Sequence, residues 1–197
     1  MPENSTEACV IDPQVLQVEK RLAELHISPG RVDGVFTKET AVALWALQKL
    51  NGIRPVSKLT PATLRALQRP RKIHAPLRNG VVVDLSRQVL FLYEHGRIRL
   101  ISHMSTGANR HYCMKGRCGY AVTPLGDYRV FRRVHGWDRG PLGSMYKTMY
   151  FNHGIALHGS KTVPRWPASH GCVRLPMHIA DRLFRLVEVG AMVRVRP

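Results

Sequence analysis

The sequence predicts a multidomain α + β protein, in which a small three-helix bundle precedes a mainly-β domain of sandwich or barrel-like form with one late helix. Three observations support this fold class. Apolar residues recur at helical spacing over about the first 70 of 197 residues, short β-rich runs begin at Gly80, and only residues 177–187 return to the helical period. We therefore expect a helical module at 1–68, a linker at 69–76 and a second domain at 77–197.

Each helix of the predicted bundle has a start signal. Asp12-Pro13 supplies an N-cap and a first-turn proline, Thr37 can cap the second helix, and Thr60-Pro61 begins the third. The second helix is expected to end at Asn51-Gly52. The segment that follows the third helix, 68–76, is basic and bracketed by prolines, which is typical of a partly extended linker.

From Gly80 onward the residues favour strands. The runs 81–85, 89–93 and 98–101 are separated by short polar turns, which predicts hairpins. Further strands are expected at 126–132, 149–151, 155–157 and 191–195.

Composition limits the location and the partners. Hydrophobic residues make up 44% of the chain, but none of the apolar runs approaches the ~18 residues of a membrane span. The first nine residues are polar and lack the apolar core of a secretory signal, so we expect either a cytoplasmic protein or a chain whose signal has been removed.

The formal net charge is +17, which favours polyanionic surroundings such as an acidic cell wall, an anionic membrane face or nucleic acid. The basic residues are scattered, and no RNA-recognition, zinc-finger or helix-turn-helix signature accompanies them. We therefore expect no nucleic-acid partner, although a basic nucleic-acid binder stays open on charge alone.

The strongest chemical signal is Ser-His-Gly-Cys-Val-Arg at residues 169–174, ten residues after His158-Gly159. A thiol is a strong nucleophile only as thiolate, which needs a nearby imidazole or cation. His158 and His170 can supply the imidazole for Cys172, and Gly171 lets backbone amides approach a substrate oxyanion. The alternative for Cys172 is a buried structural thiol.

The other cysteines suit either a disulfide bond or a metal site. Cys113 and Cys118 close a short loop that suits a disulfide, which would indicate an oxidising compartment, and Cys9 has no local partner. With His103 and His111 the pair could instead bind zinc, but the spacing matches no standard zinc site. We expect the disulfide, no metal and no cofactor.

These motifs resemble known cell-wall proteins. Residues 80–197 resemble the YkuD-like L,D-transpeptidase catalytic domain, whose hallmark is an upstream His-Gly followed by Ser-His-Gly-Cys-x-Arg. The segments 105–107 and 123–128 support the match. The N-terminal part resembles the peptidoglycan-binding three-helix module, with Thr37 where glycine is common and Leu47 where phenylalanine is common; the matching segments are 22–25, 32–36, 40–42, 47–48, 51–52 and 60–63.

The resemblance implies roles for the central residues. Cys172 would be the nucleophile, His158 its general base, and His170 a group that stabilises the tetrahedral intermediate or orients the thiol. The amides of Gly171 and Cys172 would contribute to the oxyanion hole.

Five further residues are candidates for the substrate site. Arg174 would hold the loop or a substrate carboxylate, because its planar fork suits bidentate binding, and Ser169 would order the loop. Gly159 belongs to the hallmark, and Tyr146 would face the acyl donor. Trp166 would flank the cleft, with packing in the core or at the rim as the alternative.

The implied reaction has two stages. Cys172 attacks the carbonyl of the third residue of a peptidoglycan tetrapeptide stem and releases D-alanine, and the amine of an acceptor stem then forms a 3→3 crosslink. Hydrolysis would instead make the protein an L,D-carboxypeptidase, and a non-catalytic wall-binding protein is the third reading. The resemblance also implies an extracytoplasmic location, stem peptides and anionic cell-wall polymers as partners, and acylation of the thiol by carbapenems.

Overall fold

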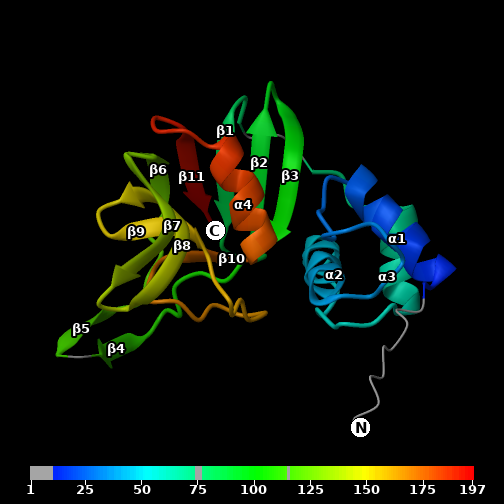
Figure 1. Ribbon diagram of the computed structural model, residues 1–197, viewed down its shortest axis with the longest axis horizontal. Coiled ribbons are helices and arrows are strands. Elements are labelled where there is room, and N and C mark those ends of the chain that lie inside the picture. The colour runs from blue at the N-terminus through cyan, green and yellow to red at the C-terminus, as the bar shows by residue number, and fades with distance from the viewer. Residues whose placement is uncertain (1–10, 74–76, 115) are drawn as a thin grey trace, which may run out of the picture.

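The computed structural model describes residues 11–73, 77–114 and 116–197, so Cys9 lies outside the described residues (Figure 1). Three N-terminal helices precede a mainly-β domain that contains one late helix, as the sequence predicts. The helices are α1 (Pro13–Glu24), α2 (Lys38–Leu50), α3 (Pro61–Gln68) and α4 (Met177–Leu186).

The predicted helix starts are confirmed. The Asp12 side chain accepts a hydrogen bond from the Gln14 N–H at 2.7 Å, and Pro13 occupies the first turn of α1. Thr37 and Thr40 form a capping box at the start of α2, and the Thr60 hydroxyl caps α3. These caps satisfy backbone amides that helix geometry leaves without a partner.

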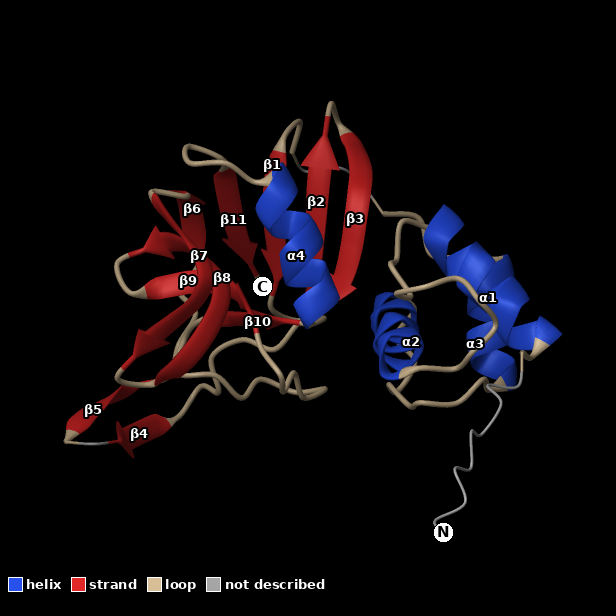
Figure 2. Ribbon diagram, viewed as in Figure 1, coloured by secondary structure: helices blue, strands red, loops and turns tan. Residues whose placement is uncertain are grey.

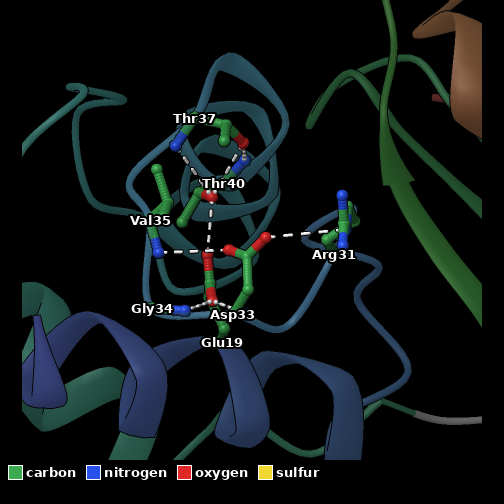
Figure 3. A network of polar contacts seen from close by, with 7 residues as sticks. All are labelled: Glu19, Arg31, Asp33, Gly34, Val35, Thr37 and Thr40. Carbon is green, nitrogen blue, oxygen red and sulfur yellow. Dashed lines mark hydrogen bonds and ion pairs between the residues drawn. The ribbon is translucent and has the colours of Figure 1, made fainter. Parts of the chain in front are cut away.

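A buried carboxyl group joins the first two helices (Figure 3). Glu19 of α1 has no exposed surface, and its oxygens accept hydrogen bonds from the Thr40 hydroxyl at 2.9 Å and from the N–H groups of Asp33 and Gly34 at 3.1 and 2.9 Å. Asp33 in turn accepts from the Val35 N–H. The connection 32–36 is therefore shaped around one side chain of α1.

The strands form two sheets and a hairpin. The five-stranded sheet has the order β3-β2-β1-β11-β6 and the four-stranded sheet the order β10-β9-β8-β7, while β4 pairs only with β5. The strands are β1 (Gly80–Asp84), β2 (Val89–Glu94), β3 (Arg97–His103), β4 (His111–Met114), β5 (Arg117–Tyr120), β6 (Gly126–Arg129), β7 (Arg132–Gly140), β8 (Gly143–Asn152), β9 (Ile155–Gly159), β10 (Val173–Leu175) and β11 (Met192–Arg196).

Both faces of the five-stranded sheet are covered. One face packs with the four-stranded sheet and α4 in a core that includes Val81, Val83, Leu157 and Leu183. On the other face, alternate residues of β1 to β3 join the helices α1 to α3 in a second apolar cluster. Figure 2 shows the three helices on the β3 side of this sheet and the four-stranded sheet on the opposite side. The helical module thus shares a core with the sheet.

Some strands differ from those predicted. The run 126–132 is two strands, because the Val130 N–H donates to Ala191 O and the Phe131 N–H donates to Tyr150 O, so the chain passes from one sheet to the other at this point. The expected strand 149–151 is the end of the longer β8, and the hairpin β4–β5 was not predicted. None of the helices within the described residues has the length and apolarity to span a bilayer.

Candidate active site

The pairing of β9 with β10 assembles the site. These strands run parallel, with His158 opposite Arg174, so the loop 169–172 that enters β10 lies beside the start of β9. Backbone hydrogen bonds between Ser105 and Arg174, in both directions at 2.9 and 3.1 Å, hold β10 from its other side. Residues far apart in sequence therefore meet at one sheet edge.

Cys172 lines an open cavity of about 780 Å³. Its thiol donates a long hydrogen bond to Gly154 O at 3.6 Å and lies 4.0 Å from Met145 Sδ. Burial raises the pKa of Cys172, while the backbone of Ala156 and the positive charge of Arg174 act in the opposite direction. The resting residue is thus a thiol that must lose its proton to react.

His158 lines the same cavity and is 5% exposed. Its Nδ1 lies 2.9 Å from Gly159 O, and because a carbonyl only accepts, Nδ1 carries the hydrogen and Nε2 is left as a proton acceptor. Burial lowers the pKa of His158 to about 4, helped by the charge of Arg174 and opposed by the Gly159 hydrogen bond. The imidazole is therefore neutral, the form that a general base requires.

The loop around the thiol is held by hydroxyl groups. Ser169 Oγ donates to Cys172 O at 2.5 Å and accepts the Gly171 N–H at 3.0 Å. Thr123 Oγ1 donates to Gly171 O at 2.6 Å and accepts the Gly107 N–H at 2.9 Å. Each hydroxyl thus links two backbone groups and fixes the loop before substrate arrives.

Gly171 is required by the backbone. Its φ is +139°, a region that side chains rarely adopt, and a Cβ at this position would lie 2.8 Å from Val122 O. Because its N–H donates to Ser169 Oγ, the predicted use of this amide in an oxyanion hole requires it to turn toward substrate, and that role stays a prediction.

His170 contacts the β4–β5 hairpin. The rings of Tyr112 and His170 meet edge to face with centroids 4.5 Å apart, and Cys113 and Cys118 are joined by a disulfide across the hairpin. Tyr112 lies opposite Gly119 in the strand pairing, where a Cβ would lie 3.0 Å from the Tyr112 hydroxyl oxygen and 3.2 Å from its ring. Burial lowers the pKa of His170, with the charges of Arg174 and Arg110 acting in the same direction.

Of the remaining predicted residues, some line the cavity and others do not. Arg174 lines the cavity. Tyr146 instead donates from its hydroxyl to Asp181 at 3.0 Å and packs near Gly159, and Trp166 is 65% exposed, so neither aromatic ring lies among the residues that line this cavity. Substrate-binding roles for Tyr146, Trp166 and Gly159 stay predictions.

Sequence reasoning missed three residues of the site, Thr123, Met145 and Tyr112. Thr123 begins a segment that was part of the family resemblance, so its position was marked but its contact with Gly171 was not. The approach of Met145 and Tyr112 depends on how hairpins fold over the loop, for which no local pattern exists.

The zinc alternative is not supported. Cys113 and Cys118 are disulfide-bonded, and His103 lies in a buried contact with Lys49 Nζ at 2.9 Å and with Val163 O at 3.2 Å. Among the described residues, no group of three or more His, Cys, Asp or Glu side chains could hold a metal ion.

Comparisons with known proteins agree with this geometry. Residues 78–195 match the family model of the L,D-transpeptidase catalytic domain, and residues 12–67 match that of a peptidoglycan binding domain. An L,D-transpeptidase from Xylanimonas cellulosilytica is 32% identical over all of both chains, with a TM-score of 0.90. An L,D-transpeptidase from Stackebrandtia nassauensis is 25% identical over 100% of this chain and 98% of the other, with a TM-score of 0.55. A search of curated sequences found no significant match.

Proposed function

Because this chain belongs to the L,D-transpeptidase family, we propose that it forms 3→3 peptidoglycan crosslinks through an acyl-enzyme on Cys172. The observation that carries the proposal is the shared cavity of Cys172 and His158, in which the Nδ1–H bond to Gly159 O leaves Nε2 to accept a proton.

The donor stage uses this pair. As Sγ attacks the carbonyl carbon of the third stem residue, His158 Nε2 takes the thiol proton. Collapse of the tetrahedral intermediate breaks the bond to the terminal D-alanine, and the imidazolium returns the proton to the departing amine. The products are free D-alanine and a thioester on Cys172.

The acceptor stage reverses the proton path. The amine of a second stem attacks the thioester, His158 removes the proton that this amine loses, and the C–S bond breaks to restore the thiol. If water attacks instead, the same acyl-enzyme gives an L,D-carboxypeptidase product. The partition depends on whether an amine reaches the cavity.

Charge in the cavity supports both stages. Arg174 lies close enough to Cys172 and His158 to change the pKa of each, so its guanidinium favours the thiolate and the developing oxyanion. His170 borders the same cavity, which supports the proposed role of its ring in orienting the intermediate.

We propose that the partners are donor and acceptor stems together with anionic cell-wall polymers, and that the protein works outside the cytoplasmic membrane. The Cys113–Cys118 disulfide supports an oxidising compartment, and the net charge of +17 supports attraction to polyanions.

The matched ranges 12–67 and 78–195 support the proposed domains 1–68 and 77–197, with 69–76 as linker.

Product analysis tests the proposal. Incubation with purified disaccharide-tetrapeptide is expected to yield free D-alanine and a 3→3 dimer, and the Cys172→Ala variant is expected to yield neither. If the products contain disaccharide-tripeptide but no dimer, the reaction is hydrolysis rather than crosslinking. Dimer formed by Cys172→Ala would overturn the assignment.

A further inference from the structure

A second cavity lies where the helical module meets the catalytic domain. It has a volume of about 480 Å³, and we call it the inter-module cavity. One wall is the first half of α2, with Lys38, Glu39, Val42 and Trp45, and the opposite wall is the segment 160–164 together with the start of α4. It is lined by two parts of the chain that match different families.

The inter-module cavity adjoins the catalytic cavity. Ser160 lines both of them, and it follows directly after His158-Gly159 at the end of β9. A ligand that occupies both cavities would therefore pass over Ser160, close to the proposed general base His158.

Hydrogen bonds and a ring contact hold the walls in place. Within the catalytic domain, His103 Nε2 lies 3.2 Å from Val163 O. Between the domains, Arg165 donates to Pro55 O at 3.0 Å and its guanidinium lies over the Trp45 ring at 4.8 Å. The segment 160–165 is thus fastened to the module in the free protein. A cavity with fixed walls loses little conformational freedom when a ligand binds.

The lining suits an uncharged polar ligand with apolar faces. The half-buried Trp45 and Val42 supply apolar surface. Ser57, Ser160 and Thr162 supply hydroxyl groups, of which Ser57 Oγ accepts from Trp45 Nε1 and Ser160 Oγ donates to Thr162 O within the protein. The charged residues that line the cavity have both signs, since Lys38 and Lys161 are basic and Glu39 is acidic. This mixture matches N-acetylated sugars better than a polyanion.

We propose that the inter-module cavity binds the glycan from which the reacting stem extends, so that the helical module and the catalytic domain form one continuous substrate site. The inference rests on the proposed function for the identity of the stem. The attacked carbonyl belongs to the third stem residue, and three extended residues span at most about 11 Å, so the sugar that carries a stem must lie close to the nucleophile. The shared Ser160 provides that continuity.

Binding to the inactive Cys172→Ala protein tests this without turnover. We expect disaccharide-tetrapeptide to bind at least about tenfold more tightly than the free tetrapeptide by calorimetry. Val42→Trp, which fills the cavity from α2, and Thr162→Trp, which fills it from the opposite wall, are each expected to reduce this ratio to about one.

Val32→Trp is the matched control, because Val32 is 42% exposed and does not line the inter-module cavity. It is expected to keep the ratio of the unfilled protein. Equal affinity for the two ligands, or a ratio that survives in both filled variants, would overturn the inference. Because no step of the assay needs catalysis, a failure of the proposed reaction would appear separately, as absent products with wild-type protein.

Discussion

At the scale of single residues, the proposed activation of the thiol depends on His158. Burial holds the pKa of His158 near 4 and raises that of Cys172, so the resting pair is neutral thiol and neutral imidazole. In the proposed reaction the proton therefore moves only as the thiol attacks, with the positive Arg174 affecting the pKa of both groups. This differs from cysteine enzymes that keep a stable thiolate–imidazolium pair.

This arrangement predicts a low acid limit for acylation. A base with a lowered pKa stays neutral down to that pKa, so kcat/KM for the donor stem should fall below about pH 4, well under the ordinary imidazole value of 6.5. Stopped-flow acylation from pH 3.5 to 7.5 measures this limit. A fall in kcat/KM centred near pH 6.5 would show that the pKa of His158 is not lowered by burial.

Lys49 predicts a second pH effect, on stability. Its Nζ is buried against His103 Nδ1 at 2.9 Å and Gln88 O at 3.4 Å, and burial lowers the pKa of Lys49 from 10.5 to about 7. Between about pH 7 and 10.5 the unfolded chain binds more protons at this residue, so its contribution makes the free energy of unfolding rise with pH. Below pH 7 the folded protein carries a buried ammonium group.

Urea unfolding at pH 6, 7.5 and 9 tests this effect. Lys49→Met is expected to show a smaller rise in the free energy of unfolding with pH than wild type, because the titrating group is gone. Lys58→Met, at an exposed position, serves as the control and should follow wild type. Equal pH dependence in all three proteins would argue against a buried, titrating Lys49.

At the scale of elements, the connection between α1 and α2 depends on Glu19. Glu19→Ala leaves the Thr40 hydroxyl and the N–H groups of Asp33 and Gly34 without this acceptor, so a loss of about 2–3 kcal/mol in the free energy of unfolding is expected. Glu24→Ala is the control, because its ion pair with Arg21 is exposed and such pairs contribute less than about 1 kcal/mol. Similar losses in both variants would contradict the account.

The β4–β5 hairpin is expected to affect the rate at which Cys172 is acylated. Its disulfide keeps Tyr112 against His170, so Cys113→Ser/Cys118→Ser is expected to slow acylation several-fold, and Tyr112→Ala should do the same while Tyr112→Phe keeps the ring contact. Stopped-flow acylation in a Cys9→Ser background measures both. Unchanged rates in the double serine variant and in Tyr112→Ala would exclude a role for the hairpin.

The elements also show what sequence can predict. The helix starts followed from local chemistry, since Asp12, Thr37 and Thr60 bond to amides only two or three residues away. The hairpin was missed because Cys113 to Cys118 is polar, glycine-containing and poor in β-branched residues, so only its strand pairing and disulfide reveal it. The Ser-His-Gly-Cys-Val-Arg motif was sufficient to predict a cysteine nucleophile. The contacts of Thr123 and Met145 with this loop join segments distant in sequence, so no local pattern predicts them.

At the scale of the whole molecule, the helical module and the catalytic domain share a core. The apolar runs Val81–Val83 and Val89–Tyr93 contain a signal for this, because strands without alternation are covered on both faces. Two domains linked by a flexible tether would leave Phe91 and Tyr93 exposed, yet they are 4% and 2% exposed. The module is therefore held against the catalytic domain rather than tethered to it.

The central claim is that a peptidoglycan stem acylates Cys172. Rapid quenching after mixing with disaccharide-tetrapeptide, followed by intact mass and peptide mapping, tests it most directly. The account predicts one disaccharide-tripeptidyl adduct on the peptide that contains Cys172, with none in Cys172→Ala and a large loss of rate in His158→Ala. An adduct on another cysteine, or release of D-alanine by Cys172→Ala, would contradict it.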